Sequence, residues 1–163
     1  MRTTRLSATL VLAVMALYFL SVPSSASVIG PPPITPCDAA VPSMTVLWPP
    51  NHKFVQVHVN GVADDNGDPM SIVIYSVFQD EPVNGTGDGD TAPDAVANMD
   101  GSVKLRAERS GTGDGRVYYV NFSAYDINGG MCVGIVTVCV PHDRGKGASA
   151  CGDGGALYDS FSQ

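Results

Sequence analysis

The residues of this chain that could do chemistry are mainly carboxylates, and many lie in three glycine-rich stretches, 64–68, 85–90 and 111–115. Calcium takes about six to eight oxygen ligands, and Asp, Asn and backbone carbonyl groups in such stretches supply them. The sequence therefore predicts a calcium-stabilised loop region, with no other cofactor. The candidate ligands are Asp64, Asn66, Asp68, Asp80, Glu81, Asp88, Asp90, Asp94 and Asp126.

The first of these stretches does not form an EF-hand. Its acidic residues have the spacing of the first three EF-hand ligands, but Pro69 stands where that loop needs Gly and Tyr75 where it needs Glu. A calcium site would instead combine the acids of residues 80–94 or recruit Asp126. The alternative is that all these residues only form turns, which Asp and Gly favour through side-chain hydrogen bonds and positive φ.

The patterns for catalysis and for phosphate binding are weak. Residues 85–89 and 111–115 repeat the letters GTGDG, but no GK[ST] follows either copy, and the serine nucleophile pattern GxSxG is absent. Asp80 and Glu81 are adjacent, so on a strand they would point to opposite faces and could not flank one glycosidic bond. We expect that this protein is not an enzyme. A small secreted hydrolase is the second alternative function.

Histidine and tryptophan offer two further candidate sites. His52 and His58 would lie roughly 20 Å apart on one strand, too far to bind the same metal ion. Trp48 is the single tryptophan, and beside two prolines it is expected to fill the end of a core. If Trp48 is exposed, it could form a sugar-binding platform with Tyr118 or Tyr119, which makes a carbohydrate-binding module the first alternative function.

Short runs of alternating apolar and polar residues must position these loops. No helix is expected after residue 26, and residues 80–100 form a long segment without alternation, which is typical of functional loops. The pattern predicts an all-β Greek-key sandwich of six or seven strands. The expected strands are 44–48, 54–60, 70–78, 103–108, 117–125 and 132–140.

The first 26 residues read as a signal peptide. Arg2 and Arg5 precede an apolar run of about 15 residues, fewer than the roughly 20 that span a membrane, and small residues follow it. We expect no transmembrane anchor after cleavage and a secreted, extracellular or cell-surface location, with the periplasm as an alternative. Loss of the two arginines would change the formal net charge from −7 to −9. Such an acidic chain disfavours nucleic acid as a partner.

The remaining chain divides by composition into three parts. Residues 27–36 are rich in proline and form a spacer, and residues 37–143 form the sandwich. Residues 144–163 form a glycine-rich tail, expected to be weakly structured and tied to the domain only by Cys151.

Four short blocks, residues 47–53, 79–85, 105–109 and 138–143, resemble an immunoglobulin-like domain of exported bacterial proteins, akin to hyalin-repeat and cadherin-like modules. The resemblance covers about residues 37–143. It implies a non-catalytic binding or structural module for adhesion or surface interaction, with an unknown protein or glycan as ligand. It supplies no catalytic residues.

The four cysteines indicate two disulfides in an exported chain. Cys132 and Cys139 would lie about 23 Å apart on opposite faces of one strand, so they cannot pair with each other, and two pairings remain. In immunoglobulin-like sandwiches the first strand often runs parallel to the last, and hyalin repeats join these strands. The resemblance therefore favours Cys37–Cys132 and Cys139–Cys151. Because no CxxC pair is present, a zinc site is disfavoured.

Overall fold

The computed structural model describes residues 37–145 and 151–163. These residues belong to Pro31–Gln163, one of the two compact units of the chain. The expected signal peptide, 1–26, and the expected spacer, 27–36, lie outside the described residues.

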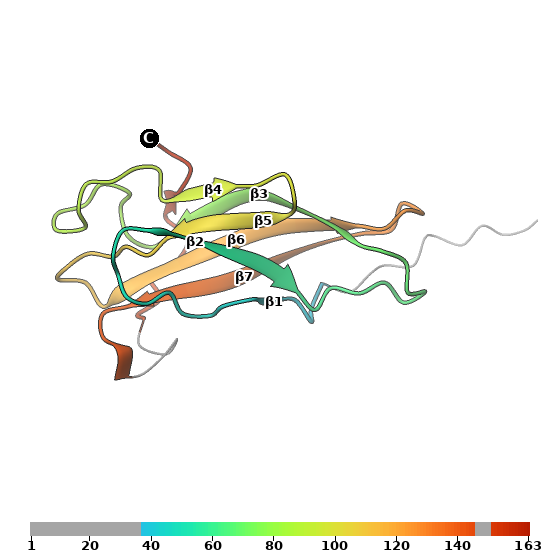
Figure 1. Cartoon of the computed structure of the whole chain (residues 1–163), viewed down its shortest axis with the longest axis horizontal. Coiled ribbons are helices and arrows are strands. Elements are labelled where there is room, and N and C mark those ends of the chain that lie inside the picture. The colour runs from blue at the N-terminus through green and yellow to red at the C-terminus, as the bar shows by residue number, and fades with distance from the viewer. Residues whose placement is uncertain (1–36, 146–150) are drawn as a thin grey trace, which may run out of the picture. The chain divides into compact units, whose positions relative to one another are not determined.

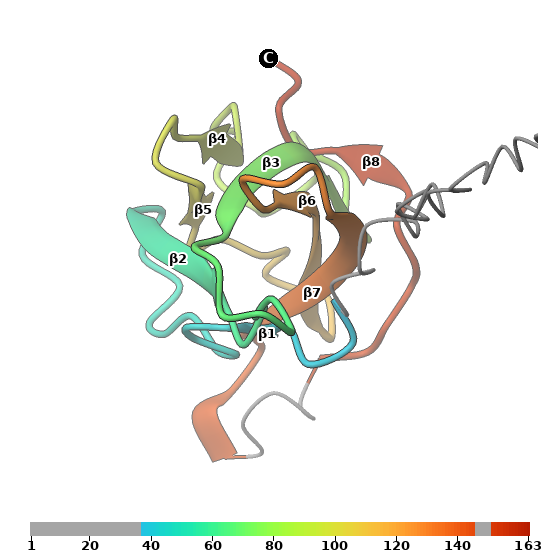
Figure 2. The ribbon, with the colours of Figure 1, turned by 90° about the vertical axis from the view of Figure 1, so that its right-hand side faces the viewer.

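The described chain is all-β, and its strands form two antiparallel four-stranded sheets that face each other (Figures 1 and 2). The first sheet has the order β1-β2-β5-β4, and the second sheet has the order β7-β6-β3-β8. The strands are β1 (Val41–Pro42), β2 (Phe54–Asn60), β3 (Ser71–Gln79), β4 (Ala95–Ala97), β5 (Ser102–Arg106), β6 (Gly115–Tyr125), β7 (Met131–Pro141) and β8 (Tyr158–Asp159).

Most of the expected strands are present with small shifts of their ends. β2 has the predicted bounds, and β3, β5, β6 and β7 are each displaced or extended by one or two residues. The prediction of a strand at residues 44–48 is wrong. In this segment only Val46 forms a β-bridge, which is parallel and pairs it with Cys139 of β7. β4 and β8 were not expected, so the count is eight strands rather than six or seven.

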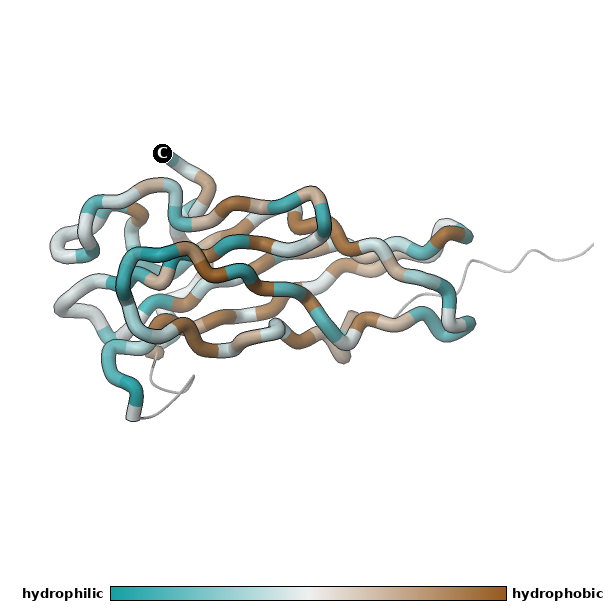
Figure 3. Tube along the Cα trace, in the orientation of Figure 1, coloured by the Kyte–Doolittle hydropathy of each residue, from teal (hydrophilic) through white to brown (hydrophobic). Residues whose placement is uncertain are grey.

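The core lies between the sheets and consists of the side chains that alternate inward. Val57, Leu105, Val120 and Phe122 have almost no exposed surface. Figure 3 shows apolar segments along the strands and hydrophilic segments mostly in the connecting loops. The alternation that defines a half-buried strand therefore places the core as the sequence predicted.

Both disulfides that the resemblance favoured are present. Cys37 bonds to Cys132 with a Cα–Cα distance of 5.8 Å, and Cys139 bonds to Cys151 with a distance of 6.0 Å. Cys132 packs in the core. Cys139 is seven positions further along β7, and because this offset is odd, its side chain points to the opposite face of the strand. One strand is thus cross-linked on both of its faces, and the two bonds indicate an oxidising, non-cytoplasmic environment.

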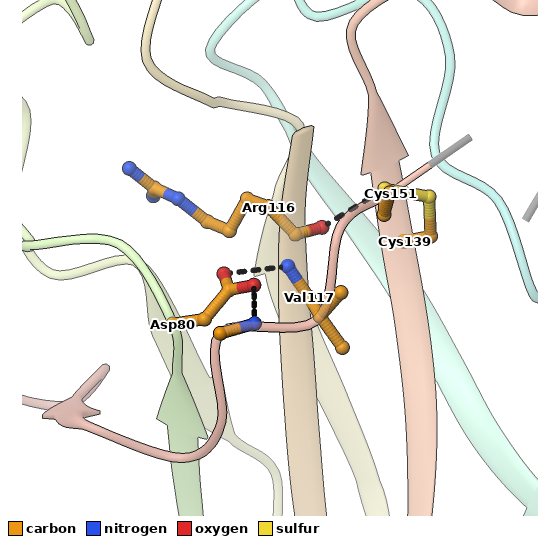
Figure 4. The surroundings of a disulfide bond; sticks show 6 residues. Asp80, Arg116, Val117, Cys139 and Cys151 are labelled. Carbon is orange, nitrogen blue, oxygen red and sulfur yellow. Dashed lines mark hydrogen bonds between the residues drawn. A yellow bond between two sulfur atoms is a disulfide. The ribbon is translucent and has the colours of Figure 1, made fainter. Parts of the chain in front are cut away.

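Residues 151–163, here called the C-terminal strap, are part of the sandwich. The strap starts at Cys151, crosses the outer face of the second sheet, and pairs with the edge of β3 as β8 (Figure 4). On the way, Asp80 accepts hydrogen bonds from the backbone N–H groups of Val117 (2.9 Å) and Gly154 (3.2 Å). The prediction of a weakly structured tail is wrong for these residues.

Ser160 connects the strap to both sheets. Its N–H donates to the carbonyl of Val77 in β3 (2.9 Å), and its carbonyl accepts from the N–H groups of Asp94 (3.0 Å) and Ala95 (2.9 Å) at the start of β4. Ser160 is fully buried. The strap therefore closes the side of the sandwich on which β4 ends the first sheet and its own strand β8, paired with β3, ends the second.

Candidate functional site

The four blocks that carry the resemblance meet at one end of the sandwich, here called the loop end. It comprises the loops 48–53, 80–94, 107–114 and 142–145, drawn at the left of Figure 1. Hydrogen bonds connect these loops directly: Ala107 with Lys53 (2.9 Å), Arg109 with His142 (3.2 Å), and Ser110 with Glu81 (2.7 Å). The loop end is thus one hydrogen-bonded unit.

The two GTGDG stretches also lie side by side at the loop end. The N–H of Gly111 in the second copy donates to the carbonyl of Gly87 in the first copy (2.9 Å). The Asp88 carboxylate of the first copy accepts hydrogen bonds from the N–H groups of Gly85 and of Asp90, which directly follows the copy. The repeated letters therefore form two contacting turns, not a phosphate-binding loop.

A fully buried arginine, Arg116 of β6, lies beneath these loops. Its guanidinium donates to Oδ2 of Asp94 (2.6 Å) and Oε2 of Glu81 (3.2 Å), and its Nη2 lies 3.7 Å from Oδ2 of Asp88. It also donates to the carbonyl of Pro82 (3.3 Å). We call Arg116 and these three acids the Arg116 cluster. A buried charge needs such partners because transfer from water costs several kcal/mol.

Asp94 lies between two arginines. Oδ2 bonds to Arg116, and Oδ1 lies 3.5 Å from Nε of Arg106, which belongs to the first sheet. Gln79 also donates to Oδ2 of Asp94 (2.8 Å) and accepts from the hydroxyl of Ser160 (2.8 Å). Burial raises the pKa of Asp94 to about 6, although Arg116 opposes the shift. The cluster thus joins both sheets and the strap.

His52 and Glu108 form the part of the site that reaches the surface. Nδ1 of His52 lies 2.8 Å from Oε2 of Glu108, which also accepts from the hydroxyl of Thr91. The Glu108 side chain is fully buried, whereas that of His52 is 48% exposed. A buried carboxylate therefore fixes the imidazole orientation, and within residues 37–145 and 151–163 no hydroxyl or thiol group bonds to that ring.

Backbone strain is concentrated beside this imidazole. His52 (φ 61°) and Asp90 (φ 53°) are the non-glycine residues with positive φ in the part of the chain that the structure describes. Gly89, at φ 101°, packs against the imidazole so closely that a Cβ atom there would lie 2.5 Å from Cε1 of His52. Strained residues of this kind concentrate at functional sites.

The acids that the sequence assigned to calcium fall into two groups. At the loop end, Glu81, Asp88 and Asp94 surround Arg116, while Asp80 binds the strap through backbone N–H groups. Burial raises the pKa of Asp80, and those N–H groups oppose the shift. Asp90 is exposed. The three predicted calcium ligands that come together at the loop end therefore surround the guanidinium of Arg116.

The other group lies at the opposite end of the sandwich, so Asp126 is not recruited to the loop end. Asp64 accepts from the N–H groups of Asn66 (2.8 Å) and Asp68 (3.3 Å), and Asp126 accepts from those of Asn128 (2.6 Å) and Gly130 (2.8 Å). These are turn-stabilising bonds. Among the described residues, no group of three or more His, Cys, Asp or Glu side chains is arranged to hold a metal ion.

The three candidate ligand aromatics have different environments. Trp48 is 40% exposed, so its expected place in the core is wrong, and it lines a surface hollow of about 680 Å³ with Val46, Pro49 and Arg144. Tyr118 is fully buried and donates to the carbonyl of Arg106 (2.8 Å), which removes it from any ligand platform. Tyr119 donates to Asp153 of the strap.

Sequence reasoning missed the central residue of the site. Arg116 occupies the same strand face as Tyr118, Val120 and Phe122, all of which are buried. A charge in phase with a buried face is a detectable signal, because such a position requires paired partners. Glu108 has no comparable signal, since it lies one position out of phase with the buried apolar residues of β5, Val103 and Leu105.

The chain was compared with family models, curated proteins and solved structures, and none of the three comparisons finds a match. Within the described residues, no helix has the length and apolar character needed to cross a membrane.

Proposed function

We propose that this chain is a non-catalytic, exported binding or structural module with an immunoglobulin-like fold, and that the loop end carries its binding surface. The observation that carries the proposal is the Arg116 cluster, which holds the surrounding loops on a rigid scaffold. Binding residues commonly lie on loops positioned in this way. The ligand would be a protein or glycan at a cell surface.

The strand order supports the immunoglobulin-like part of the proposal. If the first seven strands are lettered A to G, the first sheet is A-B-E-D, and the second is G-F-C with β8 added beside C. This is the arrangement of constant-type immunoglobulin domains, which also carry a tyrosine near the start of strand F whose hydroxyl bonds back to the backbone. Tyr118 of β6 makes such a bond to Arg106.

The export part of the proposal is supported by the disulfides and by the composition of residues 1–26. Export can be tested by expressing the whole chain in a bacterial host and determining the N-terminal sequence of the protein outside the cytoplasm. Cleavage near Ser27 is expected. Full-length protein retained in the cytoplasm would contradict it.

The binding part is tested with residues 27–163 immobilised and exposed to purified cell-wall polysaccharides and surface proteins. Retention should decrease in the double variant Asn51→Ala, Lys53→Ala, because both side chains are exposed at the loop end. Asn128→Ala, at the opposite end, is the matched control and should bind normally. Hydrolysis of ester, glycoside or peptide substrates that disappears in His52→Ala would instead identify an enzyme.

A carbohydrate-binding module is the second candidate, because Trp48 is half exposed and lines a hollow with Arg144. Aromatic rings at such sites stack on sugars, and binding would change the tryptophan fluorescence. Titration with soluble polysaccharides tests this candidate, with Trp48→Ala as the variant that should lose binding. If no polysaccharide changes the fluorescence of Trp48, this candidate fails.

Calcium stabilisation is also part of the proposal. The support is the excess of carboxylates near Arg106 and Arg116, together with two buried oxygens, Oδ1 of Asp94 and Oε1 of Glu108, that accept no hydrogen bond from described residues. A cation selective for the folded state would raise the melting temperature. Calcium should therefore raise it and chelation lower it, and indifference to both treatments would remove calcium from the proposal.

A further inference from the structure

The outer edge of β7 differs from the other edges of the two sheets. β1, β4 and β8 have two, three and two residues, whereas β7 has eleven. A long edge strand presents a row of unpaired N–H and C=O groups, and natural proteins usually block such rows with short strands, charges, prolines or bulges. β7 runs from Met131 to Pro141 in continuous register with β6.

Along a β-strand the backbone N–H and C=O groups of successive residues point alternately to the two sides, and this alternation identifies which groups of β7 are free. The N–H and C=O of Cys139 bond to Thr45 (2.9 Å) and Leu47 (2.8 Å), so they point away from β6. In an antiparallel ladder every second residue points the same way. The corresponding groups of Met131, Val133, Ile135 and Thr137 therefore face outward, and no described residue bonds to them.

The side chains along this edge are apolar and exposed. Met131 is 52%, Val133 62% and Ile135 59% exposed, and Val73 and Tyr125 extend this apolar surface across β3 and β6. The strands β3, β6 and β7 contain one charged residue, Arg116, which is buried. The strap crosses the other half of this sheet face, at Tyr119 and Asp80, and leaves the apolar half uncovered.

We propose that a second copy of this chain pairs with β7 edge to edge, in antiparallel orientation. The free stretch 131–137 is centred on Gly134, so alignment about a two-fold axis at Gly134 places Val133 opposite Ile135 of the second copy. Residues that face each other in this way exchange two hydrogen bonds. The two second sheets become one continuous sheet, and their apolar halves lie side by side.

Two observations favour a second copy over other occupants. The chain has a formal net charge of −7, and a contact between two copies must avoid bringing like charges together; this edge carries none. The segment 27–36, which precedes Cys37 in the sequence, would be a poor strand partner because four of its residues are proline and lack the N–H group. An edge of uncharged apolar residues with free backbone groups is complementary to itself.

The test uses residues 27–163 in sedimentation experiments over a wide concentration range. A dimer that dissociates on dilution is expected. Val133→Lys should be monomeric at every concentration, with the melting temperature of dilute wild type, because this side chain is exposed in the monomer. Val73→Lys is the matched control: it lies on the same face of the sheet but away from the edge, so it should still dimerise. A wild-type protein that stays monomeric at every concentration would overturn the proposal.

The alignment is tested by mixing two variants. Val133→Lys and Ile135→Glu should each be monomeric alone. An equimolar mixture should form a heterodimer, because the alignment places position 133 of one copy against position 135 of the other, where the two new side chains carry opposite charges. Failure of the mixture to associate would overturn the alignment. A dimer that is broken by Val73→Lys but not by Val133→Lys would show face-to-face stacking and overturn edge pairing.

Amide hydrogen exchange provides a readout that needs no variant. The N–H groups of Val133 and Ile135 should exchange fast in dilute wild-type protein and slow down as the concentration rises. Concentration-independent exchange at both positions would contradict the pairing. The free edge lies in the half of β7 remote from the loop end, so this proposal and the proposed binding function are tested separately.

Discussion

Arg116 donates a hydrogen bond of 2.6 Å to Oδ2 of Asp94, and neither side chain has any exposed surface. The two residues come from different sheets of the sandwich, since Arg116 lies in β6 and Asp94 directly precedes β4. Their ion pair therefore joins the sheets at the loop end, where Glu81, Asp88 and Gln79 complete its surroundings.

Replacement of Arg116 should destabilise the protein strongly. In Arg116→Met the shape is largely kept, but three buried or partly buried carboxylates lose their cation, and breaking a buried pair costs about 3–5 kcal/mol. Urea unfolding followed by circular dichroism measures the change. Lys104→Met, an exposed position on β5, is the control and should change the free energy of unfolding by no more than about 0.5 kcal/mol. An equal decrease in the free energy of unfolding in Arg116→Met and Lys104→Met would contradict a structural role for the Arg116 cluster.

The pKa of Asp94 predicts a specific dependence of stability on pH. Burial raises it from 3.8 to about 6 in the folded protein, so between these values the folded state binds more protons than the unfolded state. The contribution of Asp94 is therefore complete below pH 3.8 and is lost as the pH rises through 6. The total change is about 2–3 kcal/mol.

Unfolding of wild type and Asp94→Asn from about pH 3.5 to about pH 7.5, a range that spans the shift, isolates this group. The free energy of unfolding of wild type minus that of Asp94→Asn should fall with rising pH. A difference that rises with pH would show that pairing with Arg116 outweighs burial, and that the pKa lies below its ordinary value.

Removal of the outer disulfide should release the strap without unfolding the core. The variant Cys139→Ser, Cys151→Ser loses a short cross-link, worth about 3 kcal/mol. The amides of Leu157 and Ser160, which bond to Gln79 and Val77, should then exchange faster. The variant Cys37→Ser, Cys132→Ser should lose more stability, about 4.7 kcal/mol for the longer loop, but keep these amides protected. Equal protection in both variants would show that the strap binds without its disulfide.

Gly89 should be required for the placement of His52. A Cβ atom at Gly89 would meet the imidazole at 2.5 Å and would also force a non-glycine residue to φ 101°. Gly89→Ala should therefore cost more than backbone strain alone, which is about 1–3 kcal/mol. Gly67→Ala is the control, because Gly67 has φ 80° but no atom within 4 Å of the added Cβ. Proton NMR should show a displaced His52 ring signal in Gly89→Ala alone. An unmoved signal would mean that the glycine serves only the turn.

The fold could be predicted from the sequence wherever the hydrophobic pattern is long and regular. β2 alternates over its whole length, and β6 is apolar or aromatic along most of its length, so both were found. β4 and β8 could not be predicted in this way, because strands of three and two residues are too short to show an alternation of apolar and polar residues. Their positions are set by Ser160 and by the Cys139–Cys151 bond, which are contacts between distant parts of the chain.

The site was predicted only in part. The sequence predicted that the acids of residues 80–94 converge, and Glu81, Asp88 and Asp94 do so, whereas Asp80 binds the strap and Asp90 is exposed. Their common partner, Arg116, was missed because the apolar run that predicts this strand begins at Val117, one residue after the arginine. His52 and Glu108 are distant in sequence, and only the docking of loop 48–53 on β5 brings them into contact.

The two disulfides on opposite faces of β7 determine how a pulling force would travel through the protein. Tension applied before Cys37 and after Cys151 passes through the Cys37–Cys132 bond, along β7 to Cys139, and out through Cys151. The residues between Cys37 and Cys132 carry none of this load, so they cannot be extended while both bonds are intact. The covalent path that carries the force therefore includes only one segment of the sandwich, residues 132–139, and this segment is hydrogen-bonded to β6.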